Sequence, residues 1–225
     1  MPLAGKGILL TSMDIAPADE ADFNRWYDNE HLQERVAIEG FIEARRYVAH
    51  SGRPKYLFLY STKTIEVLDS PAYLKRLANP TPWSVKVMAR FKNMIRVVAR
   101  ITISKGAGRG AVLGMVRLRP DTSHEAALRE ALQTRLDPAG LDGIISMHLI
   151  ESDAKLSGPT QELPAAGGTG AGDWFVLIDG TGVSAVQALL AARFTGNAPP
   201  FPAMQISWGI YDLMWDLAQS DIASS

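Results

Sequence analysis

The order of predicted elements along this chain constrains the fold most, because the same order occurs twice. In the first half, alternating apolar residues predict strands and helical periodicity predicts helices at residues 8–13 (strand), 18–36 (helix), 41–49 and 55–62 (strands), 64–77 (helix, interrupted at Pro71), 84–90 (short helix) and 93–104 (strand). The second half repeats the pattern with strands at 111–118, 144–150, 174–178 and 204–214 and helices at 123–136 and 183–194. Thr122 and Glu125 predict a capping box at the helix 123–136.

Strand–helix–strand–strand–helix–strand is the order of a ferredoxin-like unit. We therefore predict an α+β fold with two tandem ferredoxin-like repeats, at residues 1–105 and 110–225. Two helices cover only one face of such a sheet, so packing the repeats face to face would form a barrel within one chain. The second repeat contains a loop rich in Gly and Pro at 152–172, which we interpret as an inert linker or, as the minority interpretation, a substrate lid.

Composition excludes several classes of function. The 225 residues are 47% hydrophobic and 21% charged, which is typical of a globular protein with a core. The formal net charge of -1 gives no basic excess for nucleic acid, and the absence of Cys excludes disulfides and thiolate chemistry. No apolar run approaches the roughly 20 residues of a membrane helix. We expect a cytoplasmic protein with a small-molecule ligand and with no nucleic-acid or membrane partner. The sequence leaves both a monomer and a homodimer open.

One segment of the predicted helix 18–36 resembles a known family. The run Trp26-Tyr27-Asp28-Asn29-Glu30-His31-Leu32, followed by Gly40-Phe41-x-x-Ala44-Arg45-Arg46-Tyr47, is similar to the W-Y-x-x-E-H-L pattern of EthD-like proteins in the dimeric α/β-barrel superfamily. The resemblance covers most of residues 6–104, whereas the second half is similar in element order alone. It implies a tandem barrel with a cleft. That superfamily includes cofactor-free monooxygenases, isomerases, lyases and haem-degrading enzymes, so the fold does not transfer a function.

His31 is the leading candidate for chemistry. Phe23, Tyr27 and His31 recur every four residues and share one stripe of the predicted helix. Imidazole can move protons near neutral pH, and Asp28 or Tyr27 lies within reach to orient the ring. The structural alternative is a buried histidine that bonds to a backbone carbonyl at the helix end.

Arginines and aromatic residues are the candidates for substrate binding. We expect the apolar odd positions of the strand 93–104 to pack under the helices, which turns Arg96 and Arg100 toward the barrel interior or cleft. There a guanidinium could hold a carboxylate or enolate oxygen, although both could instead pair with acids such as Glu43. Either Arg46 or Tyr47 faces the interior. The pocket candidates are completed by Trp26, Tyr60 and Tyr211, which could equally be ordinary core residues.

We predict a cofactor-independent enzyme that acts on a small apolar carbonyl compound or carboxylate. Its chemistry would be proton transfer at His31, as in an isomerase, lyase or decarboxylase, with monooxygenation less favoured. No cofactor or metal is expected, because phosphate loops are absent and His50, His124 and His148 are scattered. The alternatives are a non-catalytic ligand-binding or accessory protein and a scaffold with a filled barrel. A cavity of roughly 300 Å³ or more at His31 would favour the first two.

Overall fold

The computed structural model describes residues 3–160, 170–195 and 203–222. Its first half begins with strand β1 (Gly7–Asp14) and a continuous helical segment that comprises a 3₁₀ turn (Pro17–Asp19), α1 (Glu20–Trp26), a π-helical turn (Tyr27–His31) and α2 (Leu32–Val36). It continues with β2 (Phe41–Ser51), β3 (Tyr56–Thr62), a 3₁₀ turn (Ile65–Asp69), α3 (Pro71–Ala78), α4 (Pro82–Met88) and β4 (Lys92–Gly106). The predicted interruption at Pro71 is confirmed, since this proline begins α3.

The second half repeats the order with fewer helical segments. It contains β5 (Val112–Pro120), α5 (Glu125–Arg135), β6 (Ile144–Ser152), β7 (Trp174–Gly180), α6 (Val183–Arg193), β8 (Ala203–Ala218) and α7 (Gln219–Ile222). The predicted capping box is wrong. Helix α5 begins later, with His124 at its N-cap and no side-chain cap, because Ser123 bonds to Asp121 in the preceding turn.

The strands form a closed barrel in the order β1-β3-β2-β8-β5-β7-β6-β4. Within it, each half keeps the ferredoxin-like order, as β4-β1-β3-β2 and β8-β5-β7-β6. The last strands β4 and β8 have 15 and 16 residues, against 8 and 9 in β1 and β5, so their ends extend beyond their own sheets. Those ends pair with β6 and β2 of the other half and close the barrel. The predicted fold class of two tandem ferredoxin-like repeats is confirmed.

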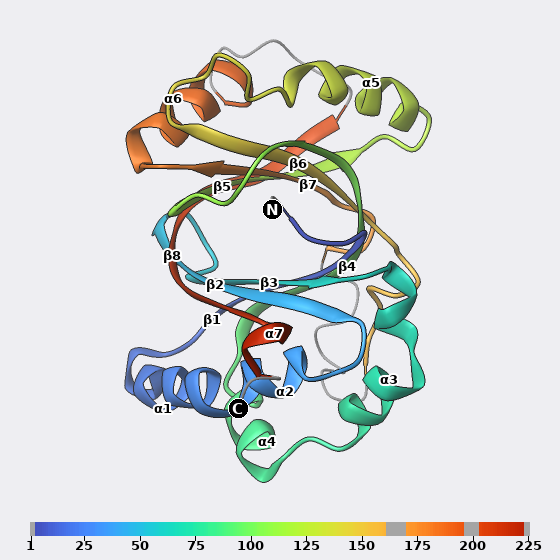
Figure 1. Ribbon diagram of the computed structural model, residues 1–225, viewed down its shortest axis with the longest axis vertical. Coiled ribbons are helices and arrows are strands. Elements are labelled where there is room, and N and C mark those ends of the chain that lie inside the picture. The colour runs from blue at the N-terminus through green and yellow to red at the C-terminus, as the bar shows by residue number, and fades with distance from the viewer. Residues whose placement is uncertain (1–2, 161–169, 196–202, 223–225) are drawn as a thin grey trace.

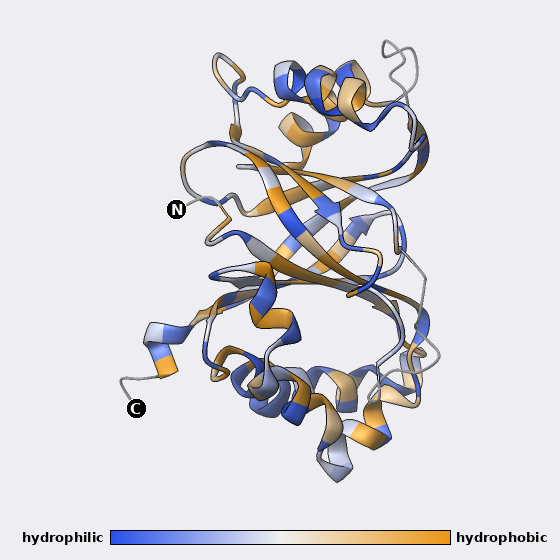
Figure 2. Cartoon of the chain, turned by 90° about the vertical axis from the view of Figure 1, so that its right-hand side faces the viewer, coloured by the Kyte–Doolittle hydropathy of each residue, from blue (hydrophilic) through white to orange (hydrophobic). Residues whose placement is uncertain are grey.

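The two halves carry their helices on opposite outer sides of the barrel. In Figure 1, α5 and α6 lie above the strands and α1 to α4 lie below, and Figure 2 shows the same layers after a turn of 90°. Alternation along the strands therefore sends one side chain into the barrel and the next under a helical layer. On β3, Leu57 and Leu59 join the core inside the barrel, while Phe58 and Tyr60 join the core under the first-half helices.

The barrel interior is filled by apolar side chains from both halves. Its core includes Leu10, Val97, Met115, Phe175 and Leu177, which come from β1, β4, β5 and β7 and are each at most 1% exposed. This core lies inside the strands, whereas Phe58 and Tyr60 on the other face of β3 pack under the first-half helices. No helix within the described ranges is long and apolar enough to cross a bilayer.

Candidate functional site

The site is built on the π-helical turn that interrupts the first long helix. The backbone N–H of Leu32 bonds to the carbonyl of Tyr27, which spans five residues and widens the helix at this point. Such turns are rare and recur at functional sites. The turn ends at His31, which points toward the sheet and is 7% exposed.

Trp26 holds the imidazole of His31 in place. The two rings stack with centroids 4.1 Å apart and an angle of 30° between their planes. The indole is itself fixed, because its Nε1 donates to Glu30 Oε1 and Ser84 Oγ, each at 3.1 Å. Trp26 was predicted as a substrate-binding residue. In the structure it packs on one face of the His31 ring and is not among the residues that line the cavity.

A small cavity lies in front of His31, between the helices and the outer face of the sheet. It has a volume of about 30 Å³. The lining residues come from β1, β3, β4 and the helical segments: Leu9, Thr11, Met13, Tyr27, His31, Arg35, Tyr60, Tyr73, Met88, Phe91, Met94 and Arg96. This cavity reaches His31 as expected, but its volume is about a tenth of the size that we set as favouring a ligand site.

Two of the lining residues contain polar atoms that lack a partner among the described residues. These are Nδ1 of His31 and Oγ1 of Thr11, both buried. Buried polar atoms are nearly always hydrogen-bonded in native proteins, because leaving one unpaired costs about 1–3 kcal/mol. These two atoms therefore have unused hydrogen-bonding capacity at the cavity, which a water molecule or a polar ligand group would satisfy.

The environment of His31 keeps its ring neutral. Burial lowers the pKa of His31 well below its usual 6.5, and the positive charges of Arg35 and Arg76 lower it further. The imidazole is therefore uncharged at neutral pH, and it is a weaker base than a free imidazole.

Arg96 supplies a buried positive charge at the same cavity. Its Nη1 donates to the carbonyls of Leu156 at 2.8 Å and Gly158 at 3.5 Å, and its Nη2 donates to the Tyr73 hydroxyl at 3.4 Å. We predicted that Arg96 faces the barrel interior or a cleft, and it lies at the cavity, but the prediction that the odd positions of this strand pack under the helices is wrong. The odd positions of β4, including Ile95 and Val97, fill the barrel, which places Arg96 under the helices.

Part of the second-half loop thereby contributes to the first-half site. Ser157 is fully buried, and its hydroxyl accepts from the N–H of Val98 and donates to the carbonyl of the same residue. The N–H of Asp153 also bonds to that carbonyl, at 2.8 Å. The described residues 153–158 are thus fixed against β4, whereas the middle of the predicted loop, 161–169, lies outside the described residues.

Asp28 does not orient His31, contrary to our expectation. It pairs with Nη1 of Arg46, and it accepts a hydrogen bond from Trp215 Nε1 at 2.9 Å. Arg46 also donates to Asn24, and its guanidinium lies 5.1–5.8 Å from the ring centroids of Phe23, Tyr27, Tyr56 and Phe58. This arrangement fastens the helix to the sheet and leaves Arg46 fully buried and away from the cavity lining.

Tyr27 and Tyr60 lie at the cavity, where Tyr27 packs edge-on against His31 at 5.1 Å between centroids. Burial raises the pKa of the Tyr27 phenol well above 10, and neighbouring Tyr60 adds to this effect. Tyr27 therefore remains protonated, and its hydroxyl donates toward Met13 Sδ at 4.0 Å. Of the two residues predicted to orient His31, Tyr27 contacts it through ring packing only.

The remaining predicted residues lie elsewhere. Arg100 is on the surface, where it pairs with Glu66 at 3.5 Å and is 56% exposed, so its predicted interior position is wrong. Tyr211 is fully buried inside the barrel, and burial raises the pKa of its phenol. Of the pair Arg46 and Tyr47, Tyr47 faces the barrel interior.

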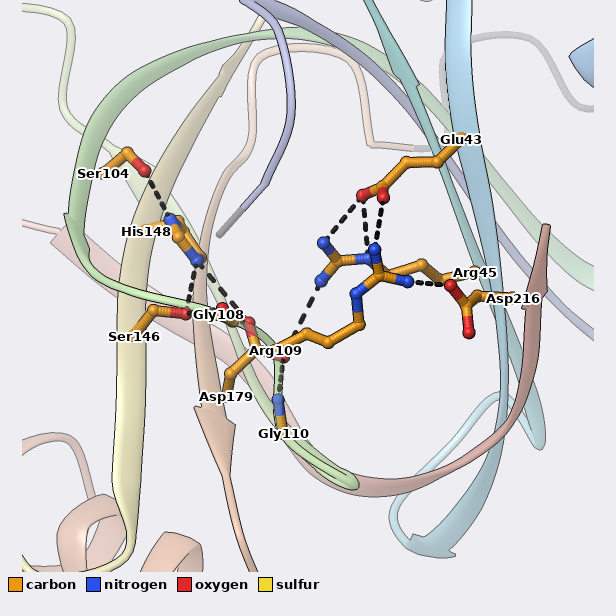
Figure 3. A network of polar contacts seen from close by, with 10 residues as sticks. All are labelled: Glu43, Arg45, Ser104, Gly108, Arg109, Gly110, Ser146, His148, Asp179 and Asp216. Carbon is orange, nitrogen blue, oxygen red and sulfur yellow. Dashed lines mark hydrogen bonds and ion pairs between the residues drawn. The ribbon is translucent and has the colours of Figure 1, made fainter. Parts of the chain in front are cut away.

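A buried polar network at one end of the barrel escaped the sequence reasoning. Figure 3 shows Asp179 near Arg45 and His148, with Ser146 bonded to His148 Nε2 at 3.0 Å. On the other side, Glu43 binds Arg45 and Arg109, and Asp179 accepts from the N–H of Gly110. Because Arg109 and Gly110 belong to the connection between the repeats, the network fastens that connection to both sheets. Its members come from distant strands, so no local spacing in the sequence indicates it.

Within the described residues, no group of three or more His, Asp or Glu side chains is arranged to hold a metal ion. His50 and His124 are half exposed and pair with Asp212 and Asp121, and His148 belongs to the buried network. His31 is the one histidine that lines the small cavity. That cavity, as it stands, is too small for a haem.

Comparisons with known proteins identify the fold. The chain matches no protein-family model and no curated protein sequence. Among solved structures, an anthrone oxidase-like protein is similar with a TM-score of 0.62 at 10% identity, over 97% of this chain and 96% of that chain. This chain has the dimeric α/β-barrel fold.

Two further structures support the same fold. A proposed monooxygenase from Fusobacterium nucleatum gives a TM-score of 0.57 at 7% identity, with 96% of this chain and 95% of that chain covered. A proposed chlorite dismutase gives 0.54 at 12% identity, with 98% and 99% covered. At these identities the likeness concerns the dimeric α/β-barrel fold alone.

Proposed function

We propose that this dimeric α/β-barrel protein is a cofactor-independent enzyme that moves a proton next to the carbonyl group of a small substrate. His31 acts as the base, and Arg96 stabilises the oxyanion that develops on the carbonyl oxygen. The observation that carries the proposal is the neutral, buried imidazole with an unpartnered Nδ1 at a cavity that also contains a buried guanidinium.

The chemistry of this pair fits such a step. A positioned base contributes about 10²–10⁴-fold to proton transfer, and preorganised positive charge stabilises the resulting enolate. Stacking on Trp26 limits the rotation of the His31 ring, and the Tyr73 hydroxyl positions Nη2 of Arg96 by a bond that ligand binding at Nη1 would leave in place. Both groups are therefore held in place in advance.

Substrate entry requires the cavity to enlarge. Its outer side is formed by Met88, Phe91 and Met94, of which Phe91 and Met94 are only partly buried. Methionine side chains are unbranched and adopt alternative rotamers at modest cost. Outward rotation of Met88 and Met94 would admit a small apolar substrate, while Phe91 stays packed against Trp26 and Trp26 stays stacked on His31.

Deuterium incorporation tests this function without knowledge of the substrate. We would incubate the protein in D₂O with a panel of small ketones, aldehydes and 2-oxo acids and follow exchange of the C–H next to the carbonyl by NMR. We expect exchange of at least one compound, reduced about 100-fold or more by His31→Gln. The matched control is His124→Gln, which changes an exposed second-half histidine and should retain full exchange. Equal exchange by His31→Gln and wild type would exclude the role of His31.

Oxygenation is a second candidate, favoured by the names of the structural neighbours, an anthrone oxidase-like protein and a proposed monooxygenase. It would begin with the same deprotonation by His31, after which the carbanion would react with O₂. An oxygen electrode separates the two outcomes, because oxygenation consumes O₂ in proportion to product and isomerisation or exchange does not.

A non-catalytic binding protein is the third candidate, favoured by the unpartnered Nδ1 of His31 and Oγ1 of Thr11 at the cavity. The volume of about 30 Å³ by itself favours the scaffold instead. Under this function, compounds would bind at His31 with no exchange and no O₂ consumption across the whole panel. Binding that depends on His31 together with an absence of turnover would establish it.

A further inference from the structure

The charge of the cavity at His31 indicates what it binds. Two arginines, Arg35 and Arg96, line it, and both are buried, with exposures of 3% and 4%. Among the residues that the structure describes, the lining includes no Asp or Glu. We infer that this cavity is a binding site for the carboxylate group of a small organic anion, with Arg96 as its principal partner. The inference rests on the site of the proposed function but not on its proton-transfer step.

The present partners of Arg96 are all neutral. In the described part of the chain, its guanidinium bonds to two backbone carbonyls and a phenol and forms no ion pair. Buried charges are normally paired with an opposite charge, because removing an ion from water is costly. A carboxylate would supply that charge and would match the two N–H groups of the guanidinium with its two oxygens.

Thr11 lies beside Arg96 and completes the site. The two residues are directly opposite in the ladder between β1 and β4, so their side chains share the outer face of the sheet. Thr11 Oγ1 is buried and has no partner among the described residues, and its hydroxyl could donate to a carboxylate oxygen. Nδ1 of His31, which lines the same cavity, is also buried and has no hydrogen-bond partner among the described residues.

Anion binding would replace loop contacts of Arg96 without releasing the loop. The carbonyls of Leu156 and Gly158 would give way to the carboxylate at Nη1. The bonds of Ser157 and Asp153 to the backbone of Val98 do not involve Arg96 and hold residues 153–158 against β4.

The volume of the cavity selects the probe. About 30 Å³ accommodates roughly two water molecules, so only the head group of a ligand fits before the methionines move. Formate has this size, and formamide is an uncharged molecule of nearly the same shape. The pair separates recognition of charge from occupation of space.

The experiment measures the thermal midpoint and the NMR spectrum during titration with sodium formate, against sodium chloride at equal ionic strength and against formamide. We expect formate, but neither chloride nor formamide, to raise the thermal midpoint in a saturable manner and to change the NMR chemical shifts of His31. The variant Arg96→Gln should bind formate with at least tenfold lower affinity. Arg100→Gln, a surface arginine four residues along the same strand, should bind like wild type. Thr11→Val provides a second variant that alters the site without removing a charge, and it should weaken formate several-fold.

The outcomes are decisive in both directions. Equal effects of formate and formamide, no effect of formate on wild type, or undiminished formate binding by both Arg96→Gln and Thr11→Val would overturn the inference. Formate binding that needs Arg96, combined with no deuterium exchange on any carbonyl compound, would support the anion site and refute the proposed proton transfer. Exchange on neutral ketones without formate binding would do the opposite.

Discussion

The two repeats place different chemistry at matching positions of their outer sheet faces. The matching positions are defined by strand register. Thr11 lies opposite Phe58 in the first repeat, and Val116 lies opposite Val176 in the second, so Thr11 corresponds to Val116 and Phe58 to Val176. By the same registers the polar first-repeat residues Thr11, Arg46, Tyr60 and Arg96 correspond to Val116, Leu149, Ile178 and Trp208. Val116, Leu149 and Ile178 are fully buried in one apolar core.

This difference separates a layer that stabilises from a layer that retains a site. The second repeat packs α5 and α6 on its sheet through apolar contacts, each of which adds to the free energy of unfolding. The first repeat buries the three guanidiniums of Arg35, Arg46 and Arg96, an imidazole and hydroxyls in its layer. Burying such groups costs stability, which a role in binding or catalysis would explain. A duplicated fold allows this division, because one repeat can supply stability while the other keeps the chemistry.

The largest effect is expected from removing the counter-ion of Arg46. Asp28→Ala leaves a fully buried guanidinium with Asn24 as its remaining side-chain hydrogen-bond partner among the described residues, and should lower the free energy of unfolding by about 3 kcal/mol. The double variant Asp28→Ala with Arg46→Leu, which copies Leu149 of the second repeat, should regain most of that loss. Urea unfolding measures both. Full stability of Asp28→Ala, with slower deuterium exchange, would instead return Asp28 to a role beside His31.

How much of this comparison could be predicted from sequence depends on the distance between the residues involved. The stripe of Phe23, Tyr27 and His31 is local, and it placed His31 on the sheet side of its helix correctly. Alternation along residues 93–104 placed Arg96 and Val97 on opposite faces of the sheet, but it could not indicate which of the two faces the helices cover. That choice depends on contacts distant in sequence, because Arg96 lies opposite Thr11 of β1, 85 positions earlier in the chain.

Two features of the site had no local signal at all. The partners of Arg96 are backbone carbonyls of Leu156 and Gly158, and any residue type offers a carbonyl. Asp28 was one of two candidates to orient His31, with Tyr27, because it is three residues away, yet the guanidinium of Arg46 from β2 pairs with it and carries a full charge. Sequence proximity favoured the weaker partner.

A second effect concerns pH and is specific to the first repeat. Because the pKa of His31 is lowered in the folded state, the unfolded chain binds the proton more tightly. The stability contributed by neutral His31 is fully present above pH 6.5 and is lost as the pH falls from 6.5 toward the lower folded pKa. His31→Gln lacks this loss, so the stability difference between wild type and variant should change in the variant's favour below pH 6.5. Urea midpoints at several pH values measure it. A parallel pH dependence of both proteins would show that His31 titrates normally.

A smaller effect is expected from placing first-repeat chemistry in the second repeat. Val116→Thr introduces a hydroxyl of similar volume at a fully buried position surrounded by apolar side chains. It should lower the free energy of unfolding by about 1–3 kcal/mol, because the new hydroxyl loses its bonds to water. Chemical unfolding gives the value. Loss of less than about 0.5 kcal/mol would mean that the second layer tolerates polar groups, and the contrast between the layers would weaken.

The reverse exchange, Thr11→Val, should have the smallest effect on stability and the opposite sign. Thr11 Oγ1 is already buried without a partner among the described residues, so its desolvation penalty is present in the wild-type protein. Replacing the hydroxyl with a methyl group keeps the volume and removes that penalty, which should raise the free energy of unfolding by less than about 1 kcal/mol. The same variant should bind formate more weakly than wild type. A gain in stability that accompanies a loss of binding is the result expected of a residue kept for its chemistry. If Thr11→Val were destabilised as much as Val116→Thr, the hydroxyl would be satisfied inside the protein, and the two layers would differ in polarity but not in purpose.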